Sequence, residues 1–203
     1  MNITLPSEWS YQDSLLLQTI ADRRSCRDYS DQTVPLESLS RLLWSAQGIN
    51  RAGKPNAPSA GAQYPVQVYV TAGRVHGLDV ASYQYLPEPH QLRMVVDRDL
   101  RGELCEAALD HQPWVAEAAM VVLLSADLDA MSIHFEDQPP TGKGGERYVY
   151  LESGAIAQNV QLVAHSLNLG AVLVGGFDDS MIAGLFSLSP SRRATALICI
   201  GVP

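Results

Sequence analysis

The sequence lacks any long apolar run, and this absence limits where the protein can work. Its 203 residues contain no stretch of about 18 consecutive apolar residues, so we expect no membrane-spanning helix. The N-terminal segment MNITLPSEWS also lacks the charged start and apolar block of a secretory signal peptide. We therefore expect a cytoplasmic protein with no membrane partner.

Cysteine is scarce as well. Cys26, Cys105 and Cys199 are the three cysteines, and they form no CxxC or Cys/His pattern. Reduced thiols are the simplest interpretation, and we expect no metal site.

Basic residues are outnumbered by acidic ones, with 14 Lys and Arg residues and 22 Asp and Glu residues, for a formal net charge of −8. This balance argues against a general nucleic-acid surface, although basic residues that cluster locally could still line a pocket. Hydrophobic residues make up 46% of the chain and charged residues 18%, as in soluble globular proteins. The length suits a single domain over residues 1–203.

Several common catalytic motifs are missing. There is no GxGxxG and no HExxH, and the five histidines have no ligand spacing. The TGKGG segment is not a P-loop, because Asp137 and Gly144 stand where Gly and Ser or Thr are needed. Ser59 lacks the strand–turn–helix setting of a nucleophile elbow. Metal-assisted or triad hydrolysis is therefore not indicated.

The stretch from Tyr148 to Phe177 organises the rest of the chain. It predicts a long helix, a stop and a short buried strand. Apolar residues recur on one helical face and polar residues on the other, namely Ile156, Val160, Val163 and Leu167 against Gln158, Gln161, His165 and Asn168. Asn168 and Gly170 predict the stop, and AVLV predicts a strand covered on both faces. Gly175 and Gly176 then form either a surface for a flat ligand or an ordinary turn.

Periodicity and turn residues predict the remaining elements. We expect helices at 11–22, 35–49, 98–111 and 178–188, and strands at 66–73, 81–86, 91–96, 118–126 and 194–201. The first helix should turn Leu15, Leu16, Thr19 and Ile20 inward. Residues 128–146 show no periodicity, and we interpret them as a loop.

Basic residues gather in the segment RRSCR. On an extended backbone Arg23, Ser25 and Arg27 point to one side, and Arg24 and Cys26 point to the other. Two guanidiniums and a hydroxyl on one side suit a phosphate or a carboxylate. A solvated basic turn is the alternative. Cys26 is predicted to be a buried, inert thiol. The small, irregular loop over residues 51–65 is either a linker or a ligand contact.

These segments together resemble the nitroreductase superfamily. The motifs that carry the resemblance are RRSxRDY, LLWSAQGI, PSAGAQYPVQVYV, RYVYLESGAIAQNVQLVAHSLNLGAVLVGGFDD and the closing IGVP, from about residue 20 onward. They are most similar to the branch of SagB-type and thiazole/oxazole-forming dehydrogenases. The resemblance implies an α+β fold with a mixed, mainly antiparallel sheet flanked by helices. It also implies an intertwined homodimer with an FMN at each end of the interface.

The resemblance further implies which residues bind FMN. The segment that binds the phosphate and the N1/O2 edge of the ring matches Arg23, Arg24, Ser25 and Arg27. The loop contributed by the other subunit matches Pro58, Ser59, Ala60 and Gly61. The strand end near N5 matches Val174, Gly175 and Gly176. Fixed cations suit phosphate, and positive charge near N1 stabilises the reduced flavin. No side chain is expected to be a catalytic acid.

Three positions depart from the family pattern. Many members add a basic residue after the C-terminal Gly-x-Pro, whereas this sequence stops at Pro203, and Arg192 and Arg193 are the candidate substitutes. The azoline-oxidising members use a Lys-Tyr pair, where this sequence has Arg147 and Tyr148. The usual His of the long helix is Ala155.

We therefore expect an FMN-dependent oxidoreductase that takes electrons from NAD(P)H by ping-pong kinetics and passes them to a small organic acceptor. Residues 128–146 are the candidate substrate lid. Three alternatives remain open: an azoline or peptide dehydrogenase, a flavin-binding protein without turnover, and an α/β domain for another anion.

Overall fold

A six-stranded antiparallel sheet forms the centre of the computed structural model, which describes residues 2–5, 10, 14–139 and 144–203. The strand order is β5-β4-β2-β6-β8-β7. These strands are β2 (Val66–Ala72), β4 (Ala81–Leu86), β5 (Gln91–Val96), β6 (Met120–Asp127), β7 (Gly170–Val174) and β8 (Arg192–Gly201). A separate parallel pair joins β1 (Val34–Pro35) to β3 (Val75–His76). The α+β prediction with a mainly antiparallel sheet is confirmed.

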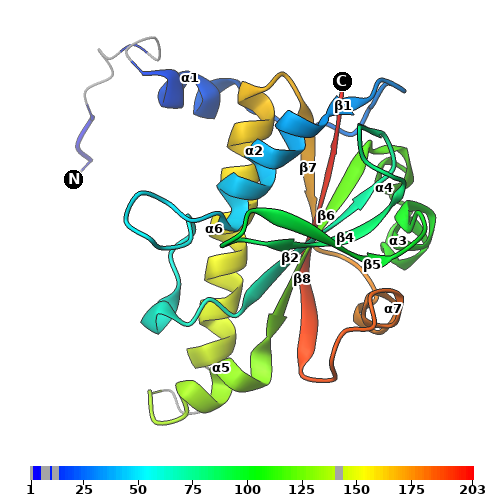
Figure 1. The fold of residues 1–203 in the computed structure, drawn as a ribbon. Coiled ribbons are helices and arrows are strands. Elements are labelled where there is room, and N and C mark those ends of the chain that lie inside the picture. Colours follow the sequence, from blue (N-terminus) through cyan, green and yellow to red (C-terminus); the bar gives the residue numbers. More distant parts are fainter. Residues whose placement is uncertain (1, 6–9, 11–13, 140–143) are drawn as a thin grey trace.

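Helices cover both faces of this sheet (Figure 1). They are α1 (Leu15–Asp22), α2 (Leu36–Gln47), α3 (Arg101–Ala107), α4 (Trp114–Glu117), α5 (Leu128–His134), α6 (Gly144–Ser166) and α7 (Asp179–Leu185), with a short 3₁₀ turn, η2 (Ala60–Ala62). The long helix α6 lies along one face together with α2, and α3, α4 and α7 lie on the other. None of these helices is long and apolar enough to cross a membrane.

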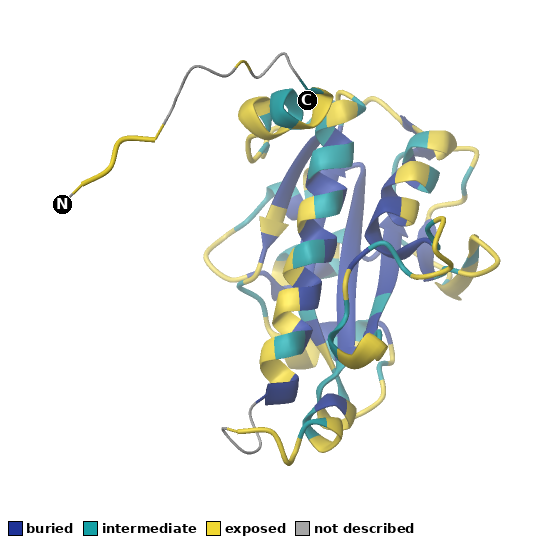
Figure 2. Ribbon diagram, turned by 90° about the vertical axis from the view of Figure 1, so that its left-hand side faces the viewer, coloured by how far each residue is buried: buried dark blue, intermediate teal, exposed yellow. Residues whose placement is uncertain are grey.

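Strand β6 shows why the layers form. Met120, Val122 and Leu124 pack under α2 and α6, whereas Val121 and Leu123 pack under α3, α4 and α7. All five side chains are fully buried, as expected when alternate residues face opposite sides of a covered strand. Figure 2 shows the buried strands behind α6.

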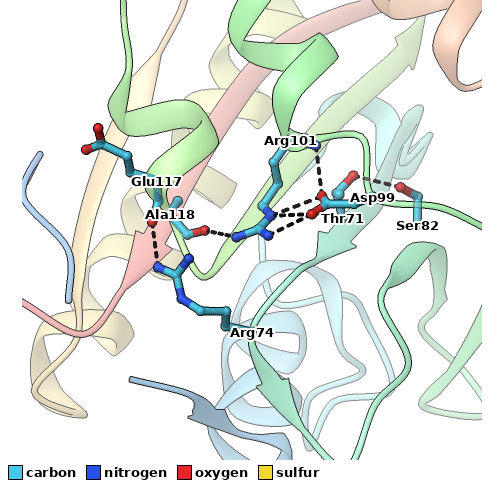
Figure 3. Close-up of polar contacts among 7 residues, drawn as sticks. All are labelled: Thr71, Arg74, Ser82, Asp99, Arg101, Glu117 and Ala118. Carbon is cyan, nitrogen blue, oxygen red and sulfur yellow. Dashed lines mark hydrogen bonds and ion pairs between the residues drawn. The ribbon is translucent and has the colours of Figure 1, made fainter. Parts of the chain in front are cut away.

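Polar groups fasten one end of the sheet (Figure 3). The guanidinium of Arg101 forms a salt bridge with Asp99 at 2.7 Å and donates to the Ala118 carbonyl at 2.6 Å. Arg74 donates to the Glu117 carbonyl at 2.6 Å. Burial alone would raise the pKa of Asp99, but the bonds from Arg101 outweigh it and hold that pKa below its usual value. These contacts tie the loop before β6 to the start of α3.

Two boundary predictions were wrong. The segment 128–146, interpreted as a loop, contains α5 and the first residues of α6. Asp127 caps α5 by accepting a hydrogen bond from Ala130 N at 2.9 Å, and Gly145 allows α5 to approach α6, because a Cβ there would lie 2.2 Å from the Met131 carbonyl oxygen. The helix predicted at 98–111 is shorter in the structure, where α3 covers Arg101–Ala107. Within the segment 128–146, Lys143 lies outside the described residues.

The apolar face of the first helix is another correction. Leu15, Leu16 and Ile20, predicted to point inward, are 81%, 57% and 51% exposed. By contrast, Asn168 takes the left-handed φ of 58° that was predicted for the stop after α6. Gln161, predicted on the polar face of α6, is buried there and lies beside the arginine segment.

Candidate functional site

The outer edge of β7 carries the first part of the candidate site. Cys26 N donates to the Ala171 carbonyl at 3.0 Å, and Ser25 forms a parallel bridge with Ala171. This close approach requires a glycine, because a Cβ at Gly170 would lie 2.5 Å from Cys26 Sγ. The arginine segment, residues 23–27, is therefore held as a short extension of the sheet.

Tyr29 fixes the same segment from behind. Its hydroxyl donates to the Cys26 carbonyl at 2.8 Å and lies 3.1 Å from the Cys199 carbonyl of β8. Burial raises the pKa of this phenol well above its ordinary value, so Tyr29 stays neutral. Burial also raises the pKa of the Cys199 thiol to about 12. Cys26 itself is half-buried rather than buried, with Sγ 3.2 Å from the Asp28 carbonyl oxygen.

A cationic cavity of about 250 Å³ opens beside the arginine segment. Arg23 and Arg24 both line it, so the predicted alternation, with Arg24 facing away from Arg23, is wrong. Arg23 Nη1 donates to Gln161 Oε1 of α6 at 3.5 Å, so the buried amide holds one guanidinium in place. The remaining lining residues are Asp22, Cys26, Gln161, His165, Asn168, Leu169, Gly170, Ala171 and Pro203.

Arg27 lies apart from this cavity, although it was predicted to share a side with Arg23. Its guanidinium lies over the Trp114 ring, 5.2 Å from the ring centroid. The planar cation can stack on the indole face and keep its N–H groups free for an anion. Trp114 therefore orients Arg27, a role that no sequence motif indicated.

The glycine corner, residues 175–176, lies where β7 ends. Leu109 N donates to the Gly176 carbonyl at 2.9 Å, and Gln112 Nε2 lies 3.4 Å from the same oxygen. Gly175 is exposed, and a Cβ on it would meet no atom within 4 Å. A flat ligand can therefore approach the backbone here.

The loop that borders this corner is conformationally unusual. Asp110 and His111 follow one another with φ values of 62° and 52°, a region that side chains rarely adopt. The helix predicted to continue through residue 111 already ends at Ala107, and Ala108 is extended and bridges to Phe177. The loop was missed because its conformation depends on contacts with Gly176 and Phe177, which follow β7.

The second predicted segment lies elsewhere. Pro58, Ser59, Ala60 and Gly61 adjoin η2 near the N-terminal end of α6, whereas the arginine segment lies near its C-terminal end (Figure 1). A Cβ at Gly61 would lie 3.3 Å from His134 Nε2 and 3.4 Å from the Phe135 ring. Within one chain, Gly61 lies by the Phe135 ring, which packs on Tyr148 of α6, whereas Arg23 contacts Gln161 further along the helix. The two segments therefore contact different parts of α6.

Arg192 and Arg193 do not complete the cationic cavity within this chain. Arg192 donates to the Pro65 and Ser125 carbonyls at 2.9 and 2.8 Å, and both arginines line a different cavity near α7. In the described part of the chain, no cluster of His, Cys, Asp or Glu side chains could hold a metal ion.

Comparison with known proteins places this geometry in a family. The model of the Nitroreductase family matches residues 20–202. The chain belongs to the nitroreductase family. A nitroreductase relative from Methanocaldococcus jannaschii is 35% identical over 189 residues, covering 93% of this chain and 90% of the relative. A nitroreductase structure from Ralstonia eutropha has a TM-score of 0.77 at 30% identity, covering 98% of this chain and 88% of that one.

A more distant structure shares the fold. The Escherichia coli microcin synthetase McbBCD, solved with a truncated pro-MccB17, contains a chain with a TM-score of 0.73 at 17% identity. The match covers 99% of this nitroreductase-family chain and 75% of that one. At this identity the likeness concerns the fold alone.

Proposed function

We propose that this protein is an FMN-dependent oxidoreductase that transfers electrons from NAD(P)H to a small organic acceptor. The family, whose members generally use flavins, supports the oxidoreductase class. The observation that carries the proposal is the shared strand edge. The arginine segment is attached to β7 at Ala171, and the same strand leads to the open glycine corner. One elongated ligand with a phosphate and a flat ring matches this arrangement.

The residues present fit FMN. Arg23 and Arg24 offer charge-assisted hydrogen bonds to a phosphate in a cavity of about 250 Å³. Gly175 leaves open space next to the backbone, where a ring can lie. Arg27 stacks on Trp114, which lies two residues after Gln112, and the Gln112 side chain contacts the Gly176 carbonyl at the glycine corner. A cation placed near N1 would favour the reduced, anionic ring.

A second copy of the chain would complete this site. Within one chain, the loop Pro58–Gly61 and the arginine segment contact different parts of α6. The exposed apolar face of α1, with Leu15, Leu16 and Ile20, is the kind of surface that a subunit interface covers. Both observations support the homodimer that the family resemblance implies.

When bound, FMN would supply the redox chemistry, accepting reducing equivalents from NAD(P)H and releasing them to the acceptor in a ping-pong cycle. The protein's contribution is to bind and position the cofactor. Arg23 and Arg24 bind the anionic end, the backbone of Gly175 and Gly176 supports the ring, and Arg27 sets the local charge. Residues 128–146 are the candidate substrate lid, and within them His134 and Phe135 border Gly61.

The absorption spectrum of the purified protein tests this proposal. Flavin bands that bleach when NADH or NADPH is added without oxygen are the expected result, and the faster nucleotide is the donor. Bands that persist with both nucleotides would exclude the reductase. Absence of bands after FMN is supplied would exclude the cofactor.

A second candidate is an azoline or peptide dehydrogenase that uses the flavin oxidatively. The fold likeness to the microcin synthetase chain favours it. Against it, the position of the Lys-Tyr pair holds Arg147 and Tyr148, and the Tyr148 hydroxyl donates to Gln138 at 2.6 Å. Oxygen consumption with an azoline-containing peptide, measured without NAD(P)H, would distinguish this activity from the reductase.

A further inference from the structure

An open cleft of about 570 Å³, which we call the proline cleft, lies between the turn after α2 and the tip of the β4–β5 hairpin (Figure 1). None of the side chains proposed to bind FMN lines it. Its volume is in the range of roughly 300–1,000 Å³ that is usual for small-molecule sites. Most of the lining is apolar or ring-bearing, namely Ile49, Pro55, Tyr64, Leu86, Pro87 and Pro89. Such a surface suits the flat body of a small organic molecule.

Lys54 and Glu88 supply the charges of the proline cleft. Both side chains are exposed, and the two salt bridges found among the described residues involve neither of them. Lys54 belongs to the turn after α2, whereas Glu88 belongs to the hairpin tip. The ammonium group of Lys54 is therefore available to pair with an anionic group on a ligand, and Glu88 would repel a second negative charge.

The turn that carries Lys54 is held by its own hydrogen bonds. Asn50 Oδ1 accepts from Ala52 N at 2.8 Å and from Lys54 N at 3.3 Å, and Asn50 N donates to the Lys54 carbonyl at 2.8 Å. Asn56 Nδ2 then ties the turn to α2 by donating to the Trp44 carbonyl at 2.6 Å. Because the backbone of Lys54 is already fixed, less conformational entropy is lost when a ligand binds.

The hairpin tip is fixed as well. His90 closes it with a φ of 50°, and its N donates to the Pro87 carbonyl at 3.2 Å. The two ring nitrogens of His90 lie 2.7 Å from the Tyr85 hydroxyl of β4 and 2.7 Å from Ser40 Oγ of α2. Pro87 and Pro89 restrict the backbone between these contacts. Both sides of the proline cleft are therefore formed before any ligand arrives.

Tyr64 connects the proline cleft to the loop that is proposed to contact flavin. Tyr64 N donates to Ser59 Oγ at 2.8 Å, and Tyr64 has a φ of 49°. Strained backbone of this kind persists only where surrounding contacts fix it, and it is concentrated at ligand sites. A molecule in contact with Tyr64 would therefore lie next to Pro58–Gly61, the loop that a partner subunit's flavin would contact.

We propose that the proline cleft binds the electron acceptor and favours a flat organic molecule with a single anionic group, such as an aromatic carboxylate. This inference rests on the proposed function, because it assigns the cleft the compound that the flavin reduces. Lys54 binds the anionic group, and Tyr64 with the prolines contacts the flat body. Glu88 disfavours compounds with a second negative charge.

Two probes of similar shape and different charge test the proposal. 4-Nitrobenzoate is an anion, whereas 4-nitrobenzamide is neutral. In calorimetric titrations of the purified protein supplied with FMN, 4-nitrobenzoate should bind more tightly. Lys54→Gln should raise its dissociation constant about 3- to 5-fold, as for an exposed ion pair, and Glu88→Gln should lower it about 2-fold. Neither change should affect 4-nitrobenzamide.

Arg51→Gln is the matched control, because Arg51 is exposed on the same turn but does not line the proline cleft. It should leave the binding of both probes unchanged. Equal losses in Arg51→Gln and Lys54→Gln would mean that general positive charge attracts the probe, and would overturn the proposal. Tighter binding of the neutral probe, or no change in Lys54→Gln, would also overturn it.

Turnover gives a second readout. The nitro group of the probe takes up two electrons and two protons, releases one oxygen as water and becomes a nitroso group. One NAD(P)H is oxidised to NAD(P)⁺ in this step, and the second proton comes from solvent. Lys54→Gln should raise KM for 4-nitrobenzoate about 3- to 5-fold with little change in kcat, because binding of the probe is weakened equally before and during reduction.

The two readouts separate this inference from the proposed function. If FMN is not bound, or is not reduced by NAD(P)H, and 4-nitrobenzoate still binds in a way that depends on Lys54, the proposed function is wrong and the cleft is an organic-anion site without that role. If nitro compounds are reduced through FMN but Lys54→Gln changes neither the dissociation constant nor KM, the proposed function stands and the assignment of the proline cleft is wrong.

Discussion

The two ends of α6 hold their candidate binding segments in different ways. At the C-terminal end, the arginine segment is tied to β7 by Cys26 N and Ala171, and Tyr29 bonds it from behind at 2.8 Å. At the N-terminal end, Pro58–Gly61 depends on the side chain of Ser59 and on a left-handed turn. Backbone pairing gives a preformed cationic half-site, whereas the loop half-site is strained and depends on its neighbours. The substitutions below test this difference.

Gly170→Ala should have the largest effect. The added Cβ would lie 2.5 Å from Cys26 Sγ and force the arginine segment off β7. Because the contacts of Arg23 and Arg27 are lost together, FMN affinity should fall by at least about 3 kcal/mol, or 100-fold, in a fluorescence titration. Gly184→Ala is the control, since nothing lies within 4 Å of its Cβ position. Adding Cys26→Gly should restore binding, and failure to restore it would contradict the steric explanation.

Arg23→Ala and Arg27→Ala come next. Each removes one charged contact and should cost roughly 1.5–3 kcal/mol of FMN affinity. Arg193→Ala serves as the control, because this exposed arginine lines another cavity. Unchanged affinity in both variants would refute the assignment of the arginine segment to flavin.

Gly61→Ala should have a smaller effect, at the loop half-site. A side chain at φ 58° costs about 1–2 kcal/mol, and His134 Nε2 lies 3.3 Å from the new Cβ. Gly53→Ala introduces the same kind of strain at φ 71° with nothing within 4 Å. Both variants should lower the melting temperature, but only Gly61→Ala should weaken FMN binding. If Gly53→Ala weakens FMN binding as much as Gly61→Ala does, the loop around Gly61 has no specific role in FMN binding.

Trp114→Leu should give the smallest effect. It removes the ring beneath Arg27 and should weaken FMN binding by about 0.5–1 kcal/mol through lost orientation. In the background of Arg27→Ala the same change should have no further effect on affinity. An additive loss in the double variant would mean that Trp114 acts independently of Arg27.

Much of the fold could be predicted from periodicity. The apolar runs of β6 and β7 are strong patterns, and β6 is buried on both faces. The prediction that AVLV is covered on both faces is wrong at Leu173, which is 44% exposed because no helix of the described residues packs over it at the edge of the sheet. The short α5 was missed because its seven residues bury only Met131 and therefore show no apolar stripe. The inward face assigned to α1 was wrong because an amphipathic pattern gives no information about which surface covers it.

The candidate site also contains parts that the sequence predicted and parts that it did not. The family motifs indicated the arginine segment, the loop and the glycine corner, which remain predictions as flavin ligands. Gln161, Trp114 and Tyr29 were not indicated, because their roles come from contacts with residues far away in the sequence. Periodicity placed Gln161 on the face of the long helix opposite the apolar stripe, but it cannot show that a polar side chain there meets Arg23.

The position of β7 has a consequence for handling the protein. It is one of the two edge strands of the sheet, and on its outer side the arginine segment pairs only around Ala171, while Leu173 stays 44% exposed. An open strand edge is a template for pairing with another chain. Molecules that lack a ligand along this edge should therefore self-associate by edge-to-edge strand pairing. The supply of cofactor during expression should then determine how much of the protein stays soluble.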